Sequence, residues 1–101
     1  MKKYEMTDDI IEVNGHILHR IRALTDSEHF EYGDEGGYIE YEHNLSHEGS
    51  CWIFDESKVY ENAKITEDAI ILADSEISGD CEIAGSVEVH SSVLTDYCYI
   101  C

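Results

Sequence analysis

Histidine and cysteine side chains recur at short spacing in two parts of the sequence. His43, His47 and Cys51 are four positions apart, and Cys98 and Cys101 form a CxxC motif. Zinc in proteins takes four nitrogen or sulfur ligands in a tetrahedron, and CxxC is a common half-site. The repeat described below assigns Cys51 to the interior, and one CxxC supplies only half of a site. We therefore expect packed or exposed thiols here, with no metal site and no redox activity.

Catalytic motifs are absent from the sequence. The glycine-rich stretch GDEGG lacks the lysine and helix that follow a phosphate-binding loop, and it is itself acidic. No Ser/His/Asp or Cys/His arrangement stands out. We expect a protein without catalytic residues and without a cofactor.

Carboxylates dominate the charged residues. The chain of 101 residues has 23 Asp and Glu against 6 Lys and Arg, a formal net charge of −17, although 43% of its residues are hydrophobic. Residues 25–57 hold ten acids and no Lys or Arg, and residues 65–101 hold eight acids and none. Such a surface repels nucleic acids and anionic membranes and attracts basic partners. We therefore expect a folded acidic protein whose partner is a basic protein.

No segment is typical of a membrane span or of a secretory signal. The sequence has no run of about 20 apolar residues, and its start, MKKYEMTDDIIEV, lacks the apolar region of a signal peptide. We expect a cytoplasmic protein. Because that compartment keeps thiols reduced, the four cysteines are expected to be thiols and not a disulfide framework.

The second half of the sequence has a period of six. A residue with a small or medium-sized side chain stands two positions before each aliphatic residue. Residues two apart point to the same face of a strand. A helix would place apolar residues three and four apart, so the period predicts a coil of short parallel strands. The aliphatic positions are Ile53, Val59, Ile65, Ile71, Ile77, Ile83 and Val89.

This pattern resembles the hexapeptide repeat of left-handed parallel β-helices. In that repeat an aliphatic residue is followed four positions later by Ser, Thr, Ala or Val, as in Ile71/Ser75, and the pair Ile77/Cys81 departs only by a thiol. The stretch GGYIEYEHNLSHEGSCWIFDESKVYENAKITEDAII also resembles the start of bacterial and phage hexapeptide-repeat transferase-like proteins. The likeness covers roughly residues 36–90 and bears more on fold than on function.

The resemblance implies an all-β fold with a short left-handed parallel β-helix of about three coils over residues 51–101. Three units make one 18-residue coil, so Ile53, Ile71 and Val89 are expected to stack. Cys51 and Cys81 then fall in different ladders, which argues against a disulfide between them. Residues 1–50 are expected to form a β-hairpin and capping loops in the same structural unit.

The hairpin is expected around Asn14-Gly15, because this dipeptide suits a type I′ turn. We place its strands at residues 4–13 and 16–24. Shorter strands are expected around residues 38–41 and near Leu45.

The six-residue rhythm breaks once. After Val89 the next aliphatic residues are Leu94 and Ile100, five and then six positions on. One residue is missing, which predicts a kink or the end of the coil. His90, beside this break, is the only histidine of the repeat. Hexapeptide acyltransferases typically work as trimers, with a histidine as general base and the acyl donor between neighbouring coils. This coil is much shorter than theirs, so acyltransferase activity is not expected.

One outward side of the coil is apolar where it should face water. Either the N-terminal hairpin covers it, through Ile17, Ile21 and Ala23 or through Leu18 and Leu24, or a second copy of the chain does. The last layer also offers an open strand edge that invites pairing. We expect a homodimer, joined end to end or through the apolar side. The residues expected at these contacts are Trp52, Phe54, Ile70, Leu72, Tyr97, Tyr99 and Ile100.

The remaining outward and corner positions carry many acids, which we expect to stack in rows. Rows of carboxylates can imitate a nucleic-acid backbone, which has about one charge per 3.4 Å per strand. We therefore predict a phage or mobile-element inhibitor, of the anti-CRISPR kind, that binds a nucleic-acid-binding enzyme such as a Cas nuclease or its guide complex. The expected partner-binding residues are Asp34, Glu35, Glu40, Glu42, Glu67, Asp68, Asp80 and Glu82.

Two alternatives to this function remain. The first is that the chain is a truncated hexapeptide-repeat protein with a transferase-like or scaffolding role. The second is that its acidity serves solubility alone.

Overall fold

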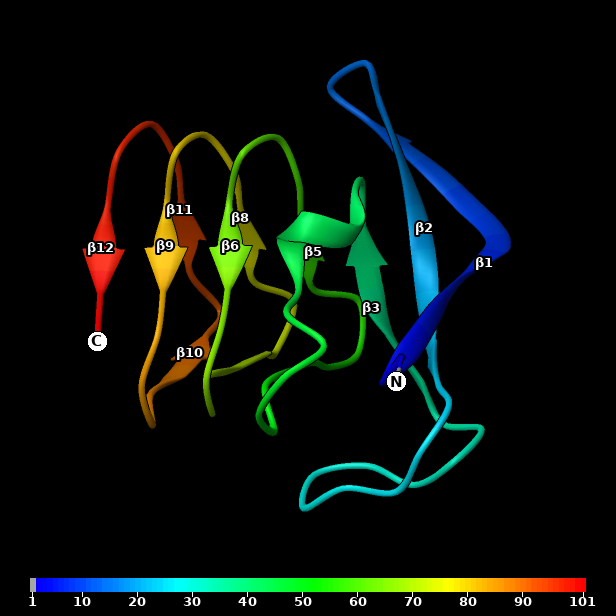
Figure 1. The fold of residues 1–101 in the computed structure, drawn as a ribbon. Helices are drawn as coiled ribbons and strands as arrows, with labels where there is room; N and C mark the ends of the chain where they lie inside the picture. Colours follow the sequence, from blue (N-terminus) through cyan, green and yellow to red (C-terminus); the bar gives the residue numbers. More distant parts are fainter. Residues whose placement is uncertain (1) are drawn as a thin grey trace.

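The computed structural model describes residues 2–101 and begins with a β-hairpin (Figure 1). Strands β1 (Tyr4–Val13) and β2 (His16–Ala23) pair antiparallel. Asn14 and Gly15 between them have φ of 51° and 85°, and a type I′ turn requires positive φ at both positions. The predicted hairpin is confirmed, with a second strand that ends one residue earlier than expected.

Strand β3 (Glu35–Ile39) joins the hairpin to the rest of the molecule. It pairs antiparallel with β2 and parallel with β5 (Lys58–Val59). The 3-10 helix η1 (Glu42–Asn44) follows, and Leu45 then makes an isolated parallel bridge to Ile65. Parallel stacking therefore begins before the boundary at residue 50 that the sequence suggested. The boundary was placed too late because this first partial turn lacks the six-residue rhythm.

The remaining strands wind into a β-solenoid of about four turns, one more than expected. In Figure 1, β6, β9 and β12 form the near side, β5, β8 and β11 the far side, and β10 lies at the bottom. β10, β7 and β4 make up the third sheet. The bounds are β4 (Trp52–Ile53), β6 (Lys64–Ile65), β7 (Ile70–Leu72), β8 (Glu76–Ile77), β9 (Glu82–Ile83), β10 (Glu88–His90), β11 (Val93–Leu94) and β12 (Tyr99–Ile100).

The core consists of the predicted ladders. Ile71 pairs with Ile53 in one neighbouring coil and with Val89 in the other. Val59 pairs with Ile77, and Ile65 with Ile83, in the same way. All of these side chains are buried, so the register predicted from the period of six is confirmed.

The missing residue shortens one coil without ending the solenoid. Leu94 pairs with Ile77, and Ile100 pairs with Ile83. These two ladders thus continue with a step of 17 residues, and the corner between β10 and β11 absorbs the deletion. The expectation that the coil ends at this point is wrong, because a corner can lose a residue while the strands on either side keep their partners.

The shortened coil also places Cys98 on Cys81. The two cysteines form a disulfide, with their Cα atoms 4.4 Å apart. The expectation that all four cysteines are thiols is therefore wrong for this pair. Cys51 and Cys101 remain free, the first buried and the second exposed.

The N-terminal region covers part of the apolar side of the solenoid. The Trp52 ring stacks on Phe30, with centroids 4.0 Å apart, and meets Tyr4 edge to face at 6.3 Å. Trp52 is buried, while Phe54, Ile70 and Leu72 farther along are only half-buried. Of the expected covering residues, Ile21 and Ala23 belong to this core, but Ile17 is exposed and Leu18 packs in a second cluster.

Candidate protein-binding surface

The corners of the solenoid hold acidic residues in the left-handed backbone region. Asp55, Glu61 and Glu67 have φ of 60°, 60° and 59°, a conformation that costs energy for residues other than glycine. One coil after Glu61, the same corner is occupied by Gly79, whose φ is 73°. A Cβ at Gly79 would lie 2.6 Å from the Asp96 backbone. The tight corners leave Asp55 and Glu67 exposed to solvent.

The outward acids do not stack on one another. Glu76 lies between Lys58 and Val93, and Glu82 lies between Lys64 and Tyr99. The predicted rows of carboxylates are therefore wrong for these strands. Like charges directly opposite each other destabilise neighbouring strands, and alternation with cations or neutral residues avoids that cost.

Two of the corner acids likewise have neutral hydrogen-bond donors in the neighbouring coil. Asp68 Oδ1 accepts hydrogen bonds from the Ser50 backbone N and hydroxyl, at 3.2 and 2.9 Å. These bonds hold the pKa of Asp68 below its ordinary value. Asp80 Oδ1 accepts a bond of 3.1 Å from the Asn62 amide. Hydroxyl and amide donors thus stabilise these carboxylates where no cation does.

Most of the acids predicted to bind a partner are exposed, but they do not form one site. Two stand at or just before β3, one in η1, two at the corner between β6 and β7, and two on the approach to β9 and in it. A shallow groove brings Asp80 and Glu82 together with His43, Asn62 and Lys64. The exposed members of the set are Asp34, Glu35, Glu42, Glu67, Asp68, Asp80 and Glu82.

Glu40 is the exception, because its carboxylate is used inside the molecule. Its side chain is only 10% exposed, and its Oε2 lies 2.8 Å from His16 Nδ1. Its Oε1 accepts a hydrogen bond of 2.9 Å from the Glu61 backbone N. Glu40 is therefore the least available of the predicted partner-binding residues, since its carboxylate connects the hairpin and the solenoid.

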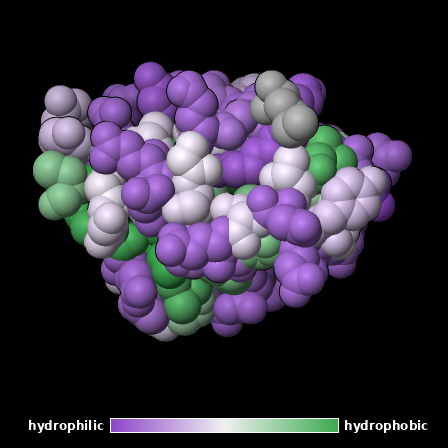
Figure 2. All heavy atoms as spheres, turned by 60° about the horizontal axis from the view of Figure 1, so that its bottom comes forward, coloured by the Kyte–Doolittle hydropathy of each residue, from purple (hydrophilic) through white to green (hydrophobic). Residues whose placement is uncertain are grey.

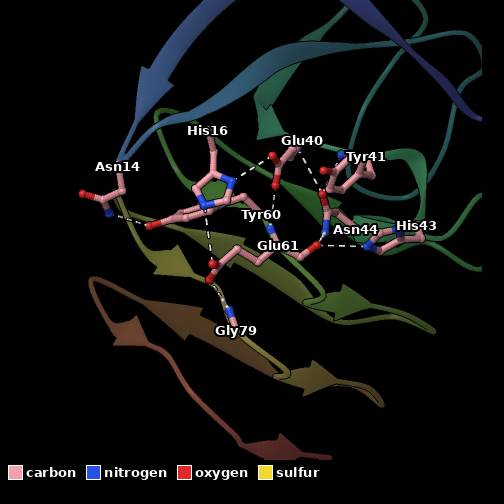
Figure 3. Close-up of polar contacts among 9 residues, drawn as sticks. All are labelled: Asn14, His16, Glu40, Tyr41, His43, Asn44, Tyr60, Glu61 and Gly79. Atoms are coloured by element: carbon pink, nitrogen blue, oxygen red, sulfur yellow. Dashed lines mark hydrogen bonds and ion pairs between the residues drawn. The ribbon is translucent and has the colours of Figure 1, made fainter.

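The cluster around His16 connects the hairpin tip with the solenoid (Figure 3). His16 Nε2 also lies 3.4 Å from Glu61 Oε2, and Glu61 Oε1 accepts a bond of 2.9 Å from Gly79 N. The hydrogen bond to Glu40 raises the pKa of His16 above its ordinary value. Sequence reasoning missed this cluster, because its members come from the hairpin, from β3's C-terminal flank and from two corners, and share no spacing.

Asn44 and Tyr60 extend the same cluster. The Asn44 amide donates to the carbonyls of Glu61 (3.2 Å) and Ala63 (2.8 Å) and accepts from the backbone N of Glu40 and Tyr41. The Tyr60 hydroxyl accepts from the Asn14 amide at 3.0 Å and donates to Glu76 at 2.6 Å. These contacts serve the fold, since they fix the hairpin tip and η1 on the first coils.

A second polar group lies at the start of the chain. Lys3 Nζ, in a buried side chain, donates to the Cys51 carbonyl at 2.7 Å and to Cys51 Sγ at 3.2 Å. Burial lowers the pKa of Lys3 and raises the pKa of Cys51, so both neutral forms are favoured. His47 accepts a hydrogen bond from the Lys3 backbone N and stacks on Tyr4 at 4.2 Å.

The side chains considered as zinc ligands contact other groups of the protein. His43 Nε2 contacts the Glu61 carbonyl at 3.0 Å, Cys51 contacts Lys3, and Cys98 is paired with Cys81. Within residues 2–101, no group of three or more His, Cys, Asp or Glu side chains is arranged to hold a metal ion.

The cations are concentrated on the N-terminal half. In the described part of the chain, every ion pair from a Lys or Arg ends on an acid within the first 56 residues. Lys2 binds Glu42 at 2.9 Å, and Arg20 binds Asp9 at 3.2 Å and Glu56 at 3.0 Å. The exposed acids of later coils therefore have no such partner among the described residues. They are Glu67, Asp68, Asp74, Asp80, Glu82, Glu88 and Asp96.

The residues predicted for self-association fall into two groups. Trp52 is buried within the chain, so it is not on offer to a second copy. In the last described coil, Tyr97 is 83% exposed and Tyr99 66% exposed, whereas Ile100 is half-buried. The aromatic residues of that coil are thus free to contact another molecule.

No protein-family model and no curated protein matches this chain. No helix among the residues described has the length and apolar character needed to cross a membrane.

Proposed function

We propose that this chain is a non-catalytic, acidic inhibitor that binds a basic nucleic-acid-binding protein and blocks its access to DNA or RNA. Inhibitors of the anti-CRISPR kind, carried by phages and mobile elements, are the class it fits best. The observation that supports the proposal is the set of exposed carboxylates after residue 56 without a Lys or Arg partner among the described residues.

These carboxylates suit a basic groove for a physical reason. A groove that binds nucleic acid carries Lys and Arg side chains, and binding is favoured because neutralising the phosphates releases counterions. Carboxylates already paired inside the protein would have to lose one cation to gain another. Those of the later coils gain new partners without that loss, and the solenoid holds them on its short strands and corners.

A second interpretation rests on the solenoid fold alone. A transferase-like or scaffolding role would agree with the resemblance to hexapeptide-repeat proteins. His90, the histidine that such a reaction would use, is 54% exposed and lies 3.0 Å from Glu88. A scaffold would bind a partner whatever the salt concentration, whereas a charge-based inhibitor would not.

The test is a DNA-cleavage or DNA-binding assay with a panel of Cas nucleases and their guide complexes. We expect the wild type to inhibit at least one of them, and we expect inhibition to weaken as salt rises, because exposed charges are screened within about 8 to 10 Å. The variant Glu67→Lys/Asp80→Lys should lose inhibition.

The matched control is Asp8→Lys/Glu12→Lys, which changes the net charge equally but alters exposed residues of the hairpin. It should retain inhibition. If no enzyme of the panel is inhibited, or if both double variants remain fully active, the acidic coils are not the binding surface.

A further inference from the structure

The loop between β2 and β3 covers only part of the apolar side and leaves a groove beside it. Phe30 of this loop packs on Trp52. Beyond it, a groove of about 370 Å³ lies between the loop and the strands β7 and β10. Figure 2, which turns the bottom of Figure 1 toward the reader, shows a hydrophobic area on this face among mainly hydrophilic residues.

The groove combines an apolar floor with acidic walls. Ile70 and Val87, both half-buried, contribute aliphatic side chains. Glu28, Asp68 and Glu88 contribute carboxylates, and the Glu28 and Glu88 side chains are 74% and 61% exposed. No Lys or Arg lines the groove.

These carboxylates keep free acceptor capacity. Ser50 bonds only Oδ1 of Asp68, so Oδ2 has no hydrogen-bond donor among residues 2–101. Among the described residues, the ion pairs of Glu28 and Glu88 are with histidines, His29 at 3.5 Å and His90 at 3.0 Å. A ligand that brings a positive charge therefore meets acceptors that the protein has left available.

We propose that this groove binds an arginine side chain from a basic segment of a partner protein. The methylene stem would lie on Ile70 and Val87, and the guanidinium among Glu28, Asp68 and Glu88. Long cationic side chains bury their stems on apolar surface and keep their charged ends on polar groups. This inference rests on the proposed function in one respect, that the partner is a basic protein.

Arginine fits the groove better than lysine. Its guanidinium is more weakly hydrated than an ammonium, matches carboxylates with two parallel hydrogen bonds, and stacks on aromatic rings. The His29 side chain, 27% exposed, lines the same groove and offers such a ring.

The experiment titrates the full chain with short synthetic peptides and follows backbone amides by NMR. The peptides share one sequence that contains Arg-Leu-Arg, with both arginines replaced by lysine or by citrulline in the matched probes. We expect the arginine peptide to shift the amides of Ile70, Val87 and Glu88. The citrulline peptide, which has the same shape without the charge, should bind about twofold to fivefold more weakly for each ion pair that it fails to make.

Two variants with the same change in net charge locate the site. Ile70→Lys places a cation and its stem over the floor of the groove, and it should lose arginine-peptide binding. Ile10→Lys alters a residue of the hairpin that is 50% exposed, and it should bind as the wild type does. Because Ile70→Lys alters a half-buried residue, its thermal melt is measured too, and Glu28→Gln, with Glu12→Gln as control, repeats the test at exposed positions.

The outcomes separate this inference from the proposed function. If the Ile10 and Ile70 variants lose affinity equally, or if Glu28→Gln and Glu12→Gln behave alike, the peptide senses overall charge and the groove is not a site. If the peptide binds as expected while no nuclease is inhibited, the groove stands and the proposed function fails. If nucleases are inhibited and no amide of the groove shifts, the proposed function stands and the groove is not an arginine site.

Discussion

His16 connects two parts of the molecule that are distant in sequence. It begins β2 of the hairpin, yet its ring nitrogens face Glu40 at 2.8 Å and Glu61 at 3.4 Å, the latter at the corner between β5 and β6. A protonated imidazole is attracted to both carboxylates, and the hydrogen bond to Glu40 raises its pKa. Charge at this one residue therefore influences how tightly the hairpin tip holds to the solenoid.

The pH dependence of stability should reveal this contact. A raised pKa in the folded state means that protonated His16 stabilises the fold fully below the ordinary histidine pKa of about 6.5, and that this contribution is lost as pH rises through the folded-state pKa. We expect the urea midpoint of the wild type to fall as pH is raised from about 6 to about 8, and His16→Gln to show a smaller fall.

His90→Gln is the matched control, because His90 is 54% exposed and faces a single exposed carboxylate, Glu88. Its urea midpoint should follow the wild-type pH dependence closely. Equal pH dependence in the wild type and in His16→Gln would show that the imidazole contributes nothing to hairpin docking.

At the scale of the element, each strand of the solenoid contributes one aliphatic side chain to a ladder. Ile71 is completely buried between Ile53 and Val89. Ile71→Asp would place an unpaired charge there, at a cost above about 4 kcal/mol. Since small domains have a total stability of about 5 to 15 kcal/mol, we expect this variant to lose its cooperative thermal transition.

Val93→Asp provides the comparison. Val93 also stands in a strand of the solenoid but is 71% exposed, so this variant should melt within a few degrees of the wild type. Circular dichroism melts of both proteins would decide the matter. A cooperative, wild-type-like melt of Ile71→Asp would mean that the ladder register is wrong.

The sequence is sufficient to predict these elements wherever a local rule applies. The period of six determines which residue of each strand points inward, and Asn14-Gly15 determines the hairpin turn. Short strands around residues 38–41 and near Leu45 were expected, but not that they form the first partial turn of the solenoid, because their parallel partners lie far away in sequence. The disulfide of Cys81 was predictable only with the 17-residue step, which becomes visible once Leu94 is aligned with Ile77.

Surface features were less predictable than the core. That the acids point outward follows from the repeat, but whether each is free depends on tertiary partners, as Glu40 shows. The groove beside Ile70 arises from where the irregular loop with Glu28 and His29 packs. No periodic pattern describes that loop, so its position could not be inferred from the sequence.

At the scale of the whole molecule, charge and shape differ between the two ends of the solenoid. The hairpin covers the end that begins with β3. Residues 86–101 have only two acids, Glu88 and Asp96, in a chain of net charge −17. By the alternation of a parallel ladder, the backbone groups of Val93 point away from β8, to which Leu94 is bonded. This coil is where two copies would repel each other least.

We therefore expect the 101-residue chain to dimerise through this coil. Because the hairpin covers the other end, contacts of this kind join like surfaces and stop at two copies. Light scattering under reducing conditions, which exclude a disulfide through the exposed Cys101, should approach twice the chain mass of 11.5 kDa as concentration rises. Tyr99→Glu adds a charge at this coil and should favour the monomer, whereas Tyr32→Glu, at a loop residue 70% exposed, should not. A mass of one chain at every concentration, or open-ended growth beyond two, would exclude this assembly.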